Sequence, residues 1–197
     1  MPSRPTLDDI RQAVARPPAI LERPESRLAA VAAVITHSRE LLFMKRAEYP
    51  GDPWSGHISF PGGRVEPDDE TALHAARRET MEELGFDLSA SEVLGQLDDL
   101  PTVSGLPDMV IRPFVFVVPE IPTLLPNREV AGTHVISIDY LLSNEGRKPF
   151  QFGHKDRDYR MASVDIDGQR LWGLTLLFVD DLLDRLDGGG RGLARIE

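Results

Sequence analysis

The sequence predicts one domain of mixed α and β structure, in which strands and helices interleave without the regular alternation of a parallel α/β fold. The chain has 197 residues, of which 41% are apolar, enough for one substantial core. Short apolar runs bounded by turn-forming residues predict strands. Two longer segments, residues 71–84 and 173–186, instead carry apolar residues at helical spacing and predict amphipathic helices.

The first 26 residues are predicted to form an extension that wraps on the domain. Thr6 can cap a short helix over Leu7–Ala15, because a threonine hydroxyl accepts hydrogen bonds from free backbone amides. Three prolines between residues 17 and 24 then predict an extended connection. We assign residues 27–187 to the domain and residues 188–197, which begin with three glycines, to a flexible tail.

Strands are predicted in order along the domain. The first two cover residues 28–36 and 40–46, with a tight turn between them, and a short third strand over residues 57–60 follows a loop. Pro113 predicts an edge position or a bulge for its strand, and residues 101–107 predict a binding loop. Asp167-Gly168 predicts a hairpin turn. The later predicted strands are residues 93–97, 109–118, 133–138, 160–166 and 169–171.

The helix over residues 71–84 carries three carboxylates on one face. At 100° per residue, Glu79, Glu82 and Glu83 fall within an arc of roughly 100°. Such like charges repel in an isolated helix, whereas Mg²⁺ and Mn²⁺ prefer carboxylate oxygens as ligands. A solvated acidic face is the alternative interpretation. The opposite face is predicted to enter a core with Leu73, Thr80, Met81 and Leu84.

The residues that flank this helix favour a functional site over a solvated face. Asp68 or Asp69 is predicted to cap its N-terminus, and Gly85 to end it in the left-handed conformation. Small side chains on the carboxylate side predict a close approach of the Gly62-Gly63 segment. These small residues are Ala72, Ala75 and Ala76.

The composition excludes several classes of protein. The formal net charge is −10, from 32 acidic and 22 basic residues, which disfavours binding to DNA or RNA phosphates. A phosphate-rich small molecule would need a metal ion or local arginines to overcome the same repulsion. The absence of cysteine excludes disulfides and zinc–thiolate sites. We see no signal segment and no apolar run of 18 residues, so we expect a cytoplasmic enzyme that does not enter a membrane.

Residues 78–86, with Glu70 upstream, closely resemble the Nudix box, G-x5-E-x7-R-E-U-x-E-E-x-G-U, where U is apolar. Six residues instead of five separate Gly63 from Glu70, and Thr80 stands where an aliphatic residue is usual. The extra residue falls in the turn at residues 67–69, where an insertion is tolerated. The resemblance implies an α/β/α sandwich with a mixed sheet, and an enzyme in which water attacks a phosphorus of a diphosphate.

The resemblance also implies the roles of the box residues. Glu79 and Glu83 would bind Mg²⁺ or Mn²⁺, with the carbonyl of Gly63 completing the metal shell. Glu82 would bind a further metal or orient water, and Arg78 would hold a box carboxylate in place.

The general base lies outside these assignments. Glu129 resembles an acidic loop position that some Nudix members use as the base, and an exposed loop carboxylate is the alternative interpretation. Glu82 or activated water alone would otherwise fill the role.

Segments outside the box resemble the coenzyme A pyrophosphatase branch of the family. They include residues 41–46, residues 56–63 with the run F-P-G-G, Ser104-Gly105 and Trp172-Gly173. The branch implies hydrolysis of coenzyme A or acyl-CoA to 3′,5′-ADP and (acyl-)4′-phosphopantetheine. Gly51, however, stands where that branch has an arginine.

Substrate contacts are therefore expected around the glycine segment, from Arg46, Gly62, Gly63, Arg64 and Ser104. The partner would be a small-molecule nucleotide, and a homodimer is left open. Other substrates remain as alternatives: ADP-ribose, a nucleotide sugar or a dinucleotide polyphosphate. A sensor that binds a nucleotide without cleaving it is a further alternative. We interpret Trp172 as a core residue in preference to a base-stacking surface.

Overall fold

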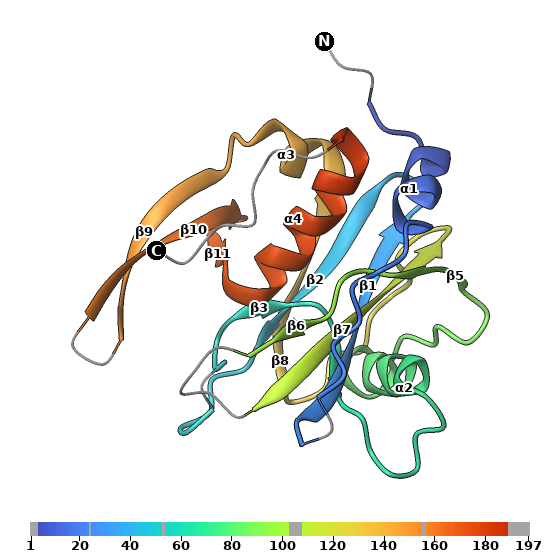
Figure 1. The fold of residues 1–197 in the computed structure, drawn as a ribbon, viewed down its shortest axis with the longest axis horizontal. Helices are drawn as coiled ribbons and strands as arrows, with labels where there is room; N and C mark the ends of the chain where they lie inside the picture. Colours follow the sequence, from blue (N-terminus) through green and yellow to red (C-terminus); the bar gives the residue numbers. More distant parts are fainter. Residues whose placement is uncertain (1–3, 24, 53, 103–107, 155–156, 189–197) are drawn as a thin grey trace.

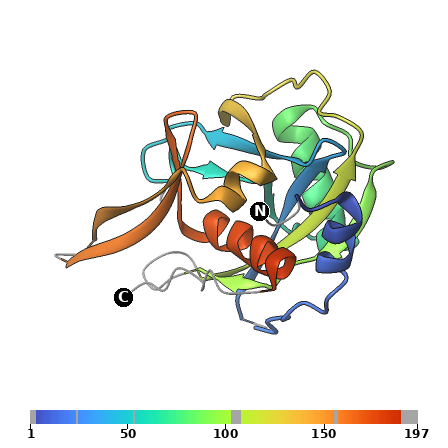
Figure 2. The ribbon, with the colours of Figure 1, turned by 90° about the horizontal axis from the view of Figure 1, so that it is seen from above.

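The computed structural model describes residues 4–23, 25–52, 54–102, 108–154 and 157–188. A mixed β-sheet lies between helix α2 on one face and helices α1 and α4 on the other (Figures 1 and 2). This arrangement confirms the predicted α/β/α sandwich. The helices are α1 (Leu7–Val14), α2 (Ala72–Leu84), α3 (Ile138–Ser143) and α4 (Gly173–Asp187).

The larger sheet has the strand order β3-β2-β1-β7-β5, and the central pair β1–β7 is parallel. Three further strands join it: β4 pairs with β1, β6 with β7 and β8 with β2. Its strands are β1 (Arg27–Thr36), β2 (Glu40–Arg46), β3 (Ile58–Ser59), β4 (Gly62–Arg64), β5 (Glu92–Gln96), β6 (Leu100–Pro101), β7 (Met109–Val118) and β8 (Val130–Ser137). A second, three-stranded sheet contains β9 (Arg147–His154), β10 (Arg157–Ile166) and β11 (Gln169–Leu171).

Alternate residues of β1 lie on opposite faces of the larger sheet. Ala30, Ala32 and Val34 are fully buried in the core beneath α2, whereas Ala33 and Ile35 belong to the core shared with α1 and α4. Alanines in the middle of a strand allow helices to pack close to the sheet. Because β1 is buried on both faces, its sequence is an almost continuous run of apolar residues.

Strands β1 and β2 diverge, and the segment that contains the two glycines fills the gap between them. The strands pair at Ile35 and Leu41, near their connecting turn. Farther along, β1 pairs with β4 through Gly62 and Gly63, while β2 pairs with β3. The backbone amide of Ala32 also donates to the carbonyl of Pro61 at 2.8 Å. The glycine segment is therefore held inside the sheet.

Several elements differ from the predictions. Strands β4, β6 and β9 and helix α3 were not predicted, and β8 begins three residues earlier than expected. The prediction of an edge position for Pro113 is wrong, because β7 lies between β1 and β5. Its missing amide lies where the antiparallel partner changes from β5 to β6, and its carbonyl accepts from Leu97. Met81 is 52% exposed, so its predicted place in the core is also wrong.

Two turns were predicted correctly. Asp167 and Gly168 have φ values of 49° and 77°, which make the two-residue turn between β10 and β11. Arg39, at the end of the turn between β1 and β2, has a φ of 63°. Among the described residues, no helix is long and apolar enough to cross a membrane.

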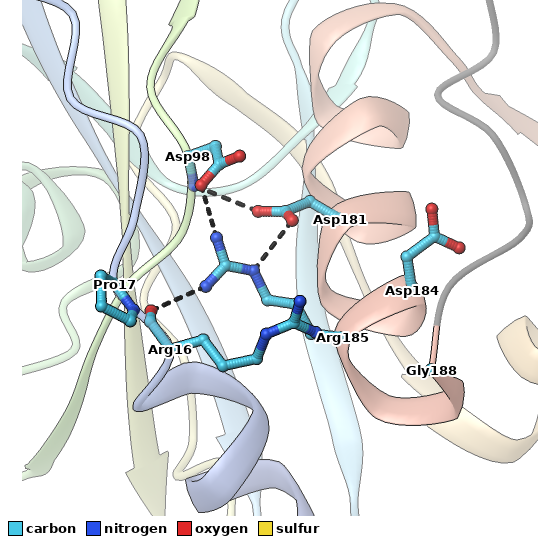
Figure 3. Close-up of a pocket in the computed structure, with 7 residues that line it drawn as sticks. All are labelled: Arg16, Pro17, Asp98, Asp181, Asp184, Arg185 and Gly188. Atoms are coloured by element: carbon cyan, nitrogen blue, oxygen red, sulfur yellow. Dashed lines mark hydrogen bonds and ion pairs between the residues drawn. The ribbon is translucent and has the colours of Figure 1, made fainter.

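The N-terminal extension is fixed to the domain by charged groups. Thr6 caps α1, as predicted, by accepting from the amide of Asp9. Beyond that helix, Arg185 of α4 donates to the carbonyl of Arg16, to Asp181 and to Asp98, around a pocket of about 220 Å³ (Figure 3). Arg185 is only 6% exposed and pairs with these carboxylates. We therefore interpret its contacts as structural, since they hold the N-terminal extension against α4.

Candidate active site

Helix α2 carries the candidate catalytic residues, and its two ends are well defined. Thr71 caps the N-terminus by accepting from the amide of His74, so the prediction of Asp68 or Asp69 as the cap is wrong. Gly85 ends the helix at a φ of 64°, as predicted. Thr71 takes the cap because the turn at residues 67–70 lies outside the helix. That turn leaves Asp69 available for a different role.

Glu83 is the most deeply buried carboxylate of the box, at 3% exposure. Its Oε2 accepts a hydrogen bond from the amide of Gly62 at 2.8 Å. Burial raises the pKa of Glu83 to about 8; the Gly62 hydrogen bond opposes this rise, and the neighbouring Glu79 adds to it. A buried carboxylate with a raised pKa, next to a second carboxylate, is typical of functional sites.

Glu79 lies against Gly63, which has no side chain to hinder it. A Cβ atom added to Gly63 would lie 2.5 Å from the Cδ of Glu79, closer than atoms approach in proteins. Burial raises the pKa of Glu79, and the charge of Arg78 opposes that rise. The predicted close approach of the glycine segment to this helix is therefore confirmed, and it brings two carboxylates to one short strand.

Arg78 connects α2 to the preceding turn and to the box carboxylates. It donates two hydrogen bonds to Asp69, at 3.0 and 2.9 Å, and a third to Glu79 at 3.0 Å. A weaker contact reaches Glu82 at 3.3 Å, and the carbonyl of Arg64 accepts at 3.0 Å. Arg78 is thus a fixed cation that orients Glu79 from one side.

Asp69 is the residue that sequence reasoning missed here. Its side chain is 1% exposed, and the hydrogen bonds from Arg78 lower its pKa. Glu70, which was aligned with the first glutamate of the box, is exposed and makes no such contact with Arg78. The signal was present, because five residues separate Gly63 from Asp69, which is the spacing that the box gives to its first acidic residue.

Replacing Asp69 with asparagine is expected to weaken the hold on Arg78. Losing a charge-assisted pair costs about 1.5–3 kcal/mol, and outer-shell partners of metal ligands typically affect activity roughly 10- to 100-fold. We therefore expect a lower melting temperature and a lower kcat. The matched control is Glu70→Gln, which removes a neighbouring exposed charge and should change neither the melting temperature nor kcat. Equal effects of the two substitutions would contradict the assignment of Asp69.

A pocket of about 450 Å³ opens at the end of β2, and two of the residues that line it, Arg46 and Glu129, act electrostatically on Glu83. Arg46 lines it and donates to Asp52 at 2.9 Å. The Nε of Arg46 is buried and has no hydrogen-bond partner. Burial acts to raise the pKa of Asp52, but hydrogen bonds from Trp54 and Arg46 outweigh it and lower that pKa. The pocket therefore contains an arginine with unused hydrogen-bonding capacity, already paired with one carboxylate.

Glu129 reaches the same pocket from a different part of the chain. The amides of Leu125 and Asn127 donate to the carbonyls of Leu84 and Glu83, which fastens the loop to the end of α2. The carbonyl of Glu129 accepts from Ala47 at 2.8 Å. Its charge contributes to the raised pKa of Glu83, so the two carboxylates are electrostatic neighbours.

The structure brings most of the predicted site residues together, with three exceptions. Glu82 is 55% exposed, accepts from Arg78 and acts on Glu79 through its charge. The side chain of Arg64 is exposed, and only its carbonyl makes a contact with the site. Ser104 lies outside the described residues. The residues that lie together are Arg46, Gly62, Gly63, Arg78, Glu79, Glu83 and Glu129.

Within the described part of the chain, no three His, Cys, Asp or Glu side chains gather in an arrangement that could hold a metal ion by themselves. The donor set nevertheless suits Mg²⁺, which is usually bound through one or two carboxylates while water and substrate phosphates supply the remaining oxygens. Glu79 and Glu83 are two carboxylates of this kind, and the missing side chain of Gly63 lets the Glu79 carboxylate lie directly against the glycine strand. The residues present therefore fit a hard divalent cation.

The fold and the site define the class of protein: a mixed-sheet domain in which a glycine strand lies against a carboxylate-bearing helix. The NUDIX domain family matches residues 26–156, more than half of the chain. A protein of Yersinia pestis (strain Pestoides F), named Uncharacterized Nudix hydrolase NudL, is 31% identical over 147 residues, which are 74% of this chain and 72% of that protein. The chain therefore belongs to the NUDIX domain family.

Solved structures have the same fold. The MutT protein of Methanosarcina mazei Go1 superposes with a TM-score of 0.50 at 22% identity, covering 63% of this chain and 85% of that chain. An Ap4A hydrolase of C. elegans superposes with a TM-score of 0.50 at 17% identity, covering 59% and 84%. As a Nudix hydrolase, the chain is a pyrophosphohydrolase that acts on nucleoside diphosphate derivatives.

Proposed function

We propose that this enzyme is a metal-dependent diphosphatase that cleaves coenzyme A or acyl-CoA to 3′,5′-ADP and (acyl-)4′-phosphopantetheine. The observation that carries the proposal is the convergence of Glu79 and Glu83 on the Gly62–Gly63 strand, beside a pocket that contains Arg46. The preference for coenzyme A is supported by the run Phe60–Gly63, which leads from β3 into that strand.

Each residue of the site has a role in this reaction. Glu79, Glu83 and the carbonyl of Gly63 would hold Mg²⁺ or Mn²⁺. When bound, the cation neutralises charge on the non-bridging oxygens of the diphosphate and makes coordinated water more acidic. Arg78 keeps Glu79 in place, and Arg46, which lines the pocket, would place its guanidinium charge beside the diphosphate.

Glu129 is the proposed general base, because it is a carboxylate at the pocket that is free of the buried environment of Glu83. Glu129→Gln is expected to remove most of kcat while leaving the affinity for Mn²⁺ unchanged, since a base removes a proton and does not bind the cation. Titration of Mn²⁺ by electron paramagnetic resonance, beside steady-state kinetics, separates the two. A loss of kcat below tenfold would move the role to Glu82 or to activated water.

A second candidate substrate is favoured by Asp52. This carboxylate already occupies Arg46, and together with Glu129 it balances the charges of Arg46 and Arg128 around the pocket. A balanced pocket suits a substrate with fewer phosphates than coenzyme A, such as ADP-ribose. Carboxylates accept hydrogen bonds from sugar hydroxyls, whereas they repel an additional phosphate.

Substitutions of Arg46 and of Asp52 are expected to change KM in opposite directions. Arg46→Ala is expected to raise KM for the diphosphate substrate roughly 10- to 100-fold with a smaller change in kcat, because a charge-assisted contact contributes about 1.5–3 kcal/mol. Asp52→Asn keeps the hydrogen-bonding shape but removes the competing charge, so KM for coenzyme A should fall.

The matched control for this pair is Arg64→Ala, which removes an exposed cation on the other side of the glycine strand and should leave KM within about threefold. If Arg64→Ala raised KM as strongly as Arg46→Ala, the position assigned to the diphosphate would be wrong. If ADP-ribose were turned over a hundredfold more efficiently than coenzyme A, the substrate proposal would fail while the family assignment stood.

A further inference from the structure

Four aromatic side chains form a cluster outside the catalytic residues, and we name it the aromatic wall: His57, Phe150, Phe152 and Trp172. Trp172 is at its centre. The ring centroid of Trp172 lies 4.7 Å from that of His57, 5.2 Å from Phe150 and 4.8 Å from Phe152. The three ring planes are inclined to Trp172 by 56°, 81° and 50°, so the rings form a curved surface rather than a flat stack.

The wall is not part of the closed core. All four side chains are partly exposed, whereas Phe43 and Phe116 of the sheet are fully buried. Our interpretation of Trp172 as a core residue is therefore corrected. Three residues of β10 and β11, by contrast, are buried in the main core. They are Val164, Ile166 and Leu171.

The wall is built from segments that the fold brings together. Phe150 and Phe152 are two residues apart in β9 and so share one face of that strand. Trp172 stands between β11 and α4, as the N-cap residue of the helix. In Figure 1 the β9–β10 hairpin extends outward from the body of the protein, on the side of β3. Both rings of β9 contact Trp172, whose third neighbour, His57, belongs to the loop that precedes β3.

His57 connects the wall to the catalytic pocket. Its carbonyl accepts a hydrogen bond from the amide of Arg46 at 2.9 Å, and its ring is electrostatically coupled to Asp52 and Arg46, two residues that line the pocket. Burial lowers the pKa of His57, although Asp52 opposes this, so the ring is a neutral planar surface at neutral pH. His57 therefore links the wall to two residues that line the pocket, Arg46 through the backbone and Asp52 through its charge.

We propose that the aromatic wall binds the nucleobase of the diphosphate substrate, with Trp172 as the stacking surface. The proposal rests on the proposed function, because it places the non-phosphate part of a nucleotide beyond the pocket that would take its diphosphate. Bases stack on aromatic side chains with little dependence on charge, which suits a wall of neutral rings on an acidic protein. The guanidinium of Arg170 lies over the ring of Phe150, 4.2 Å from its centroid, and adds a cation at the edge of the wall.

The chain offers a direct reporter, since Trp172 and Trp54 are its two tryptophans. In a Trp54→Phe protein, all tryptophan fluorescence comes from Trp172. AMP and ribose 5-phosphate are titrated separately into this protein without metal; the two ligands carry the same phosphate and differ in the base. We expect saturable quenching by AMP and none by ribose 5-phosphate. Equal responses to both ligands, or no response to either, would overturn the proposal.

A second experiment separates binding from a structural role. Trp172→Leu is expected to raise KM roughly 5- to 100-fold with kcat within about threefold of the parent, and Trp172→Phe to restore most of the affinity. If Trp172→Leu does not fold, the comparison of Trp172→Phe with the parent and the AMP titration still decide the matter. A fall in kcat with unchanged KM would contradict base binding.

The two proposals fail in different ways. The fluorescence titration needs no hydrolysis, so an AMP response in a protein that cleaves none of the tested diphosphates would leave the wall in place and refute the reaction. Hydrolysis of coenzyme A without any AMP response, and with KM unchanged in Trp172→Leu, would refute the wall and leave the reaction in place.

Discussion

Glu83→Gln is expected to lower kcat at least about a hundredfold, and Glu79→Gln to do the same. Each substitution removes one of the two carboxylates that would hold the cation, which weakens metal binding and the activation of water together. The measurement is steady-state hydrolysis over a range of Mg²⁺ concentrations. Activity near that of the parent enzyme at low Mg²⁺ in either variant would show that the metal ligands are assigned wrongly.

Glu83→Gln should also stabilise the metal-free protein. The pKa of Glu83 is raised from 4.5 to about 8, so the folded state holds the proton more tightly than the unfolded state. That contribution is complete below about pH 4.5 and is lost as the pH rises toward 8. Glutamine cannot ionise, so the free energy of unfolding of Glu83→Gln should exceed that of the parent by up to about 4 kcal/mol at pH 8. The difference should shrink toward pH 5, as measured by urea unfolding in the presence of a chelator.

The two neighbouring glycines should respond in different ways to alanine. At Gly62, φ is 146°, and a Cβ atom would lie 2.5 Å from the Cα of Val31. Because that neighbour is backbone, Gly62→Ala is expected to destabilise the fold by at least about 3 kcal/mol. At Gly63 the neighbour is the carboxylate of Glu79, which can move aside. Gly63→Ala should therefore remain folded, with the free energy of unfolding within about 1 kcal/mol, and lose activity roughly 10- to 100-fold.

Thermal unfolding and kcat, measured on both glycine variants, test this division. An additional control is Gly132→Ala, since a Cβ atom at Gly132 in β8 would meet nothing within 4 Å. It should change neither quantity appreciably. A Gly63→Ala enzyme with unchanged kcat would mean that Glu79 does not need its position beside the glycine strand.

The parts of the fold that the sequence predicted are those with strong local signals. Helix α2 has a glycine stop and apolar residues at helical spacing, and the β10–β11 hairpin has an Asp-Gly turn. Strand β9 was missed because Arg147, Lys148 and Pro149 interrupt any apolar alternation, and its structure depends on pairing with β10. Strand β4 was missed because glycine is a poor strand former; these residues are extended because they fill the gap between β1 and β2.

The site was predictable as far as the box extends. The carboxylates of α2 and the glycine strand follow from a motif, whereas Asp52 and Asp69 act through contacts that depend on the three-dimensional fold. The sequence has one residue more than the box between Gly63 and Glu70. This insertion makes Asp69, and not Glu70, the acidic residue that accepts from Arg78. The exposure of Trp172 depends on where the β9–β10 hairpin lies, and no pattern in the sequence indicates that position.

The central claim is that the box carboxylates catalyse metal-dependent cleavage of a diphosphate bridge. The most direct measurement is chromatographic product analysis after incubation with coenzyme A, ADP-ribose, NADH or a diadenosine polyphosphate, each with Mg²⁺ or Mn²⁺ and each with a chelator. We predict that coenzyme A yields 3′,5′-ADP and 4′-phosphopantetheine with either metal, that the chelator abolishes the reaction, and that Glu83→Gln yields almost no product. Cleavage that continues in the chelator, or intact substrates throughout the series, would contradict the account.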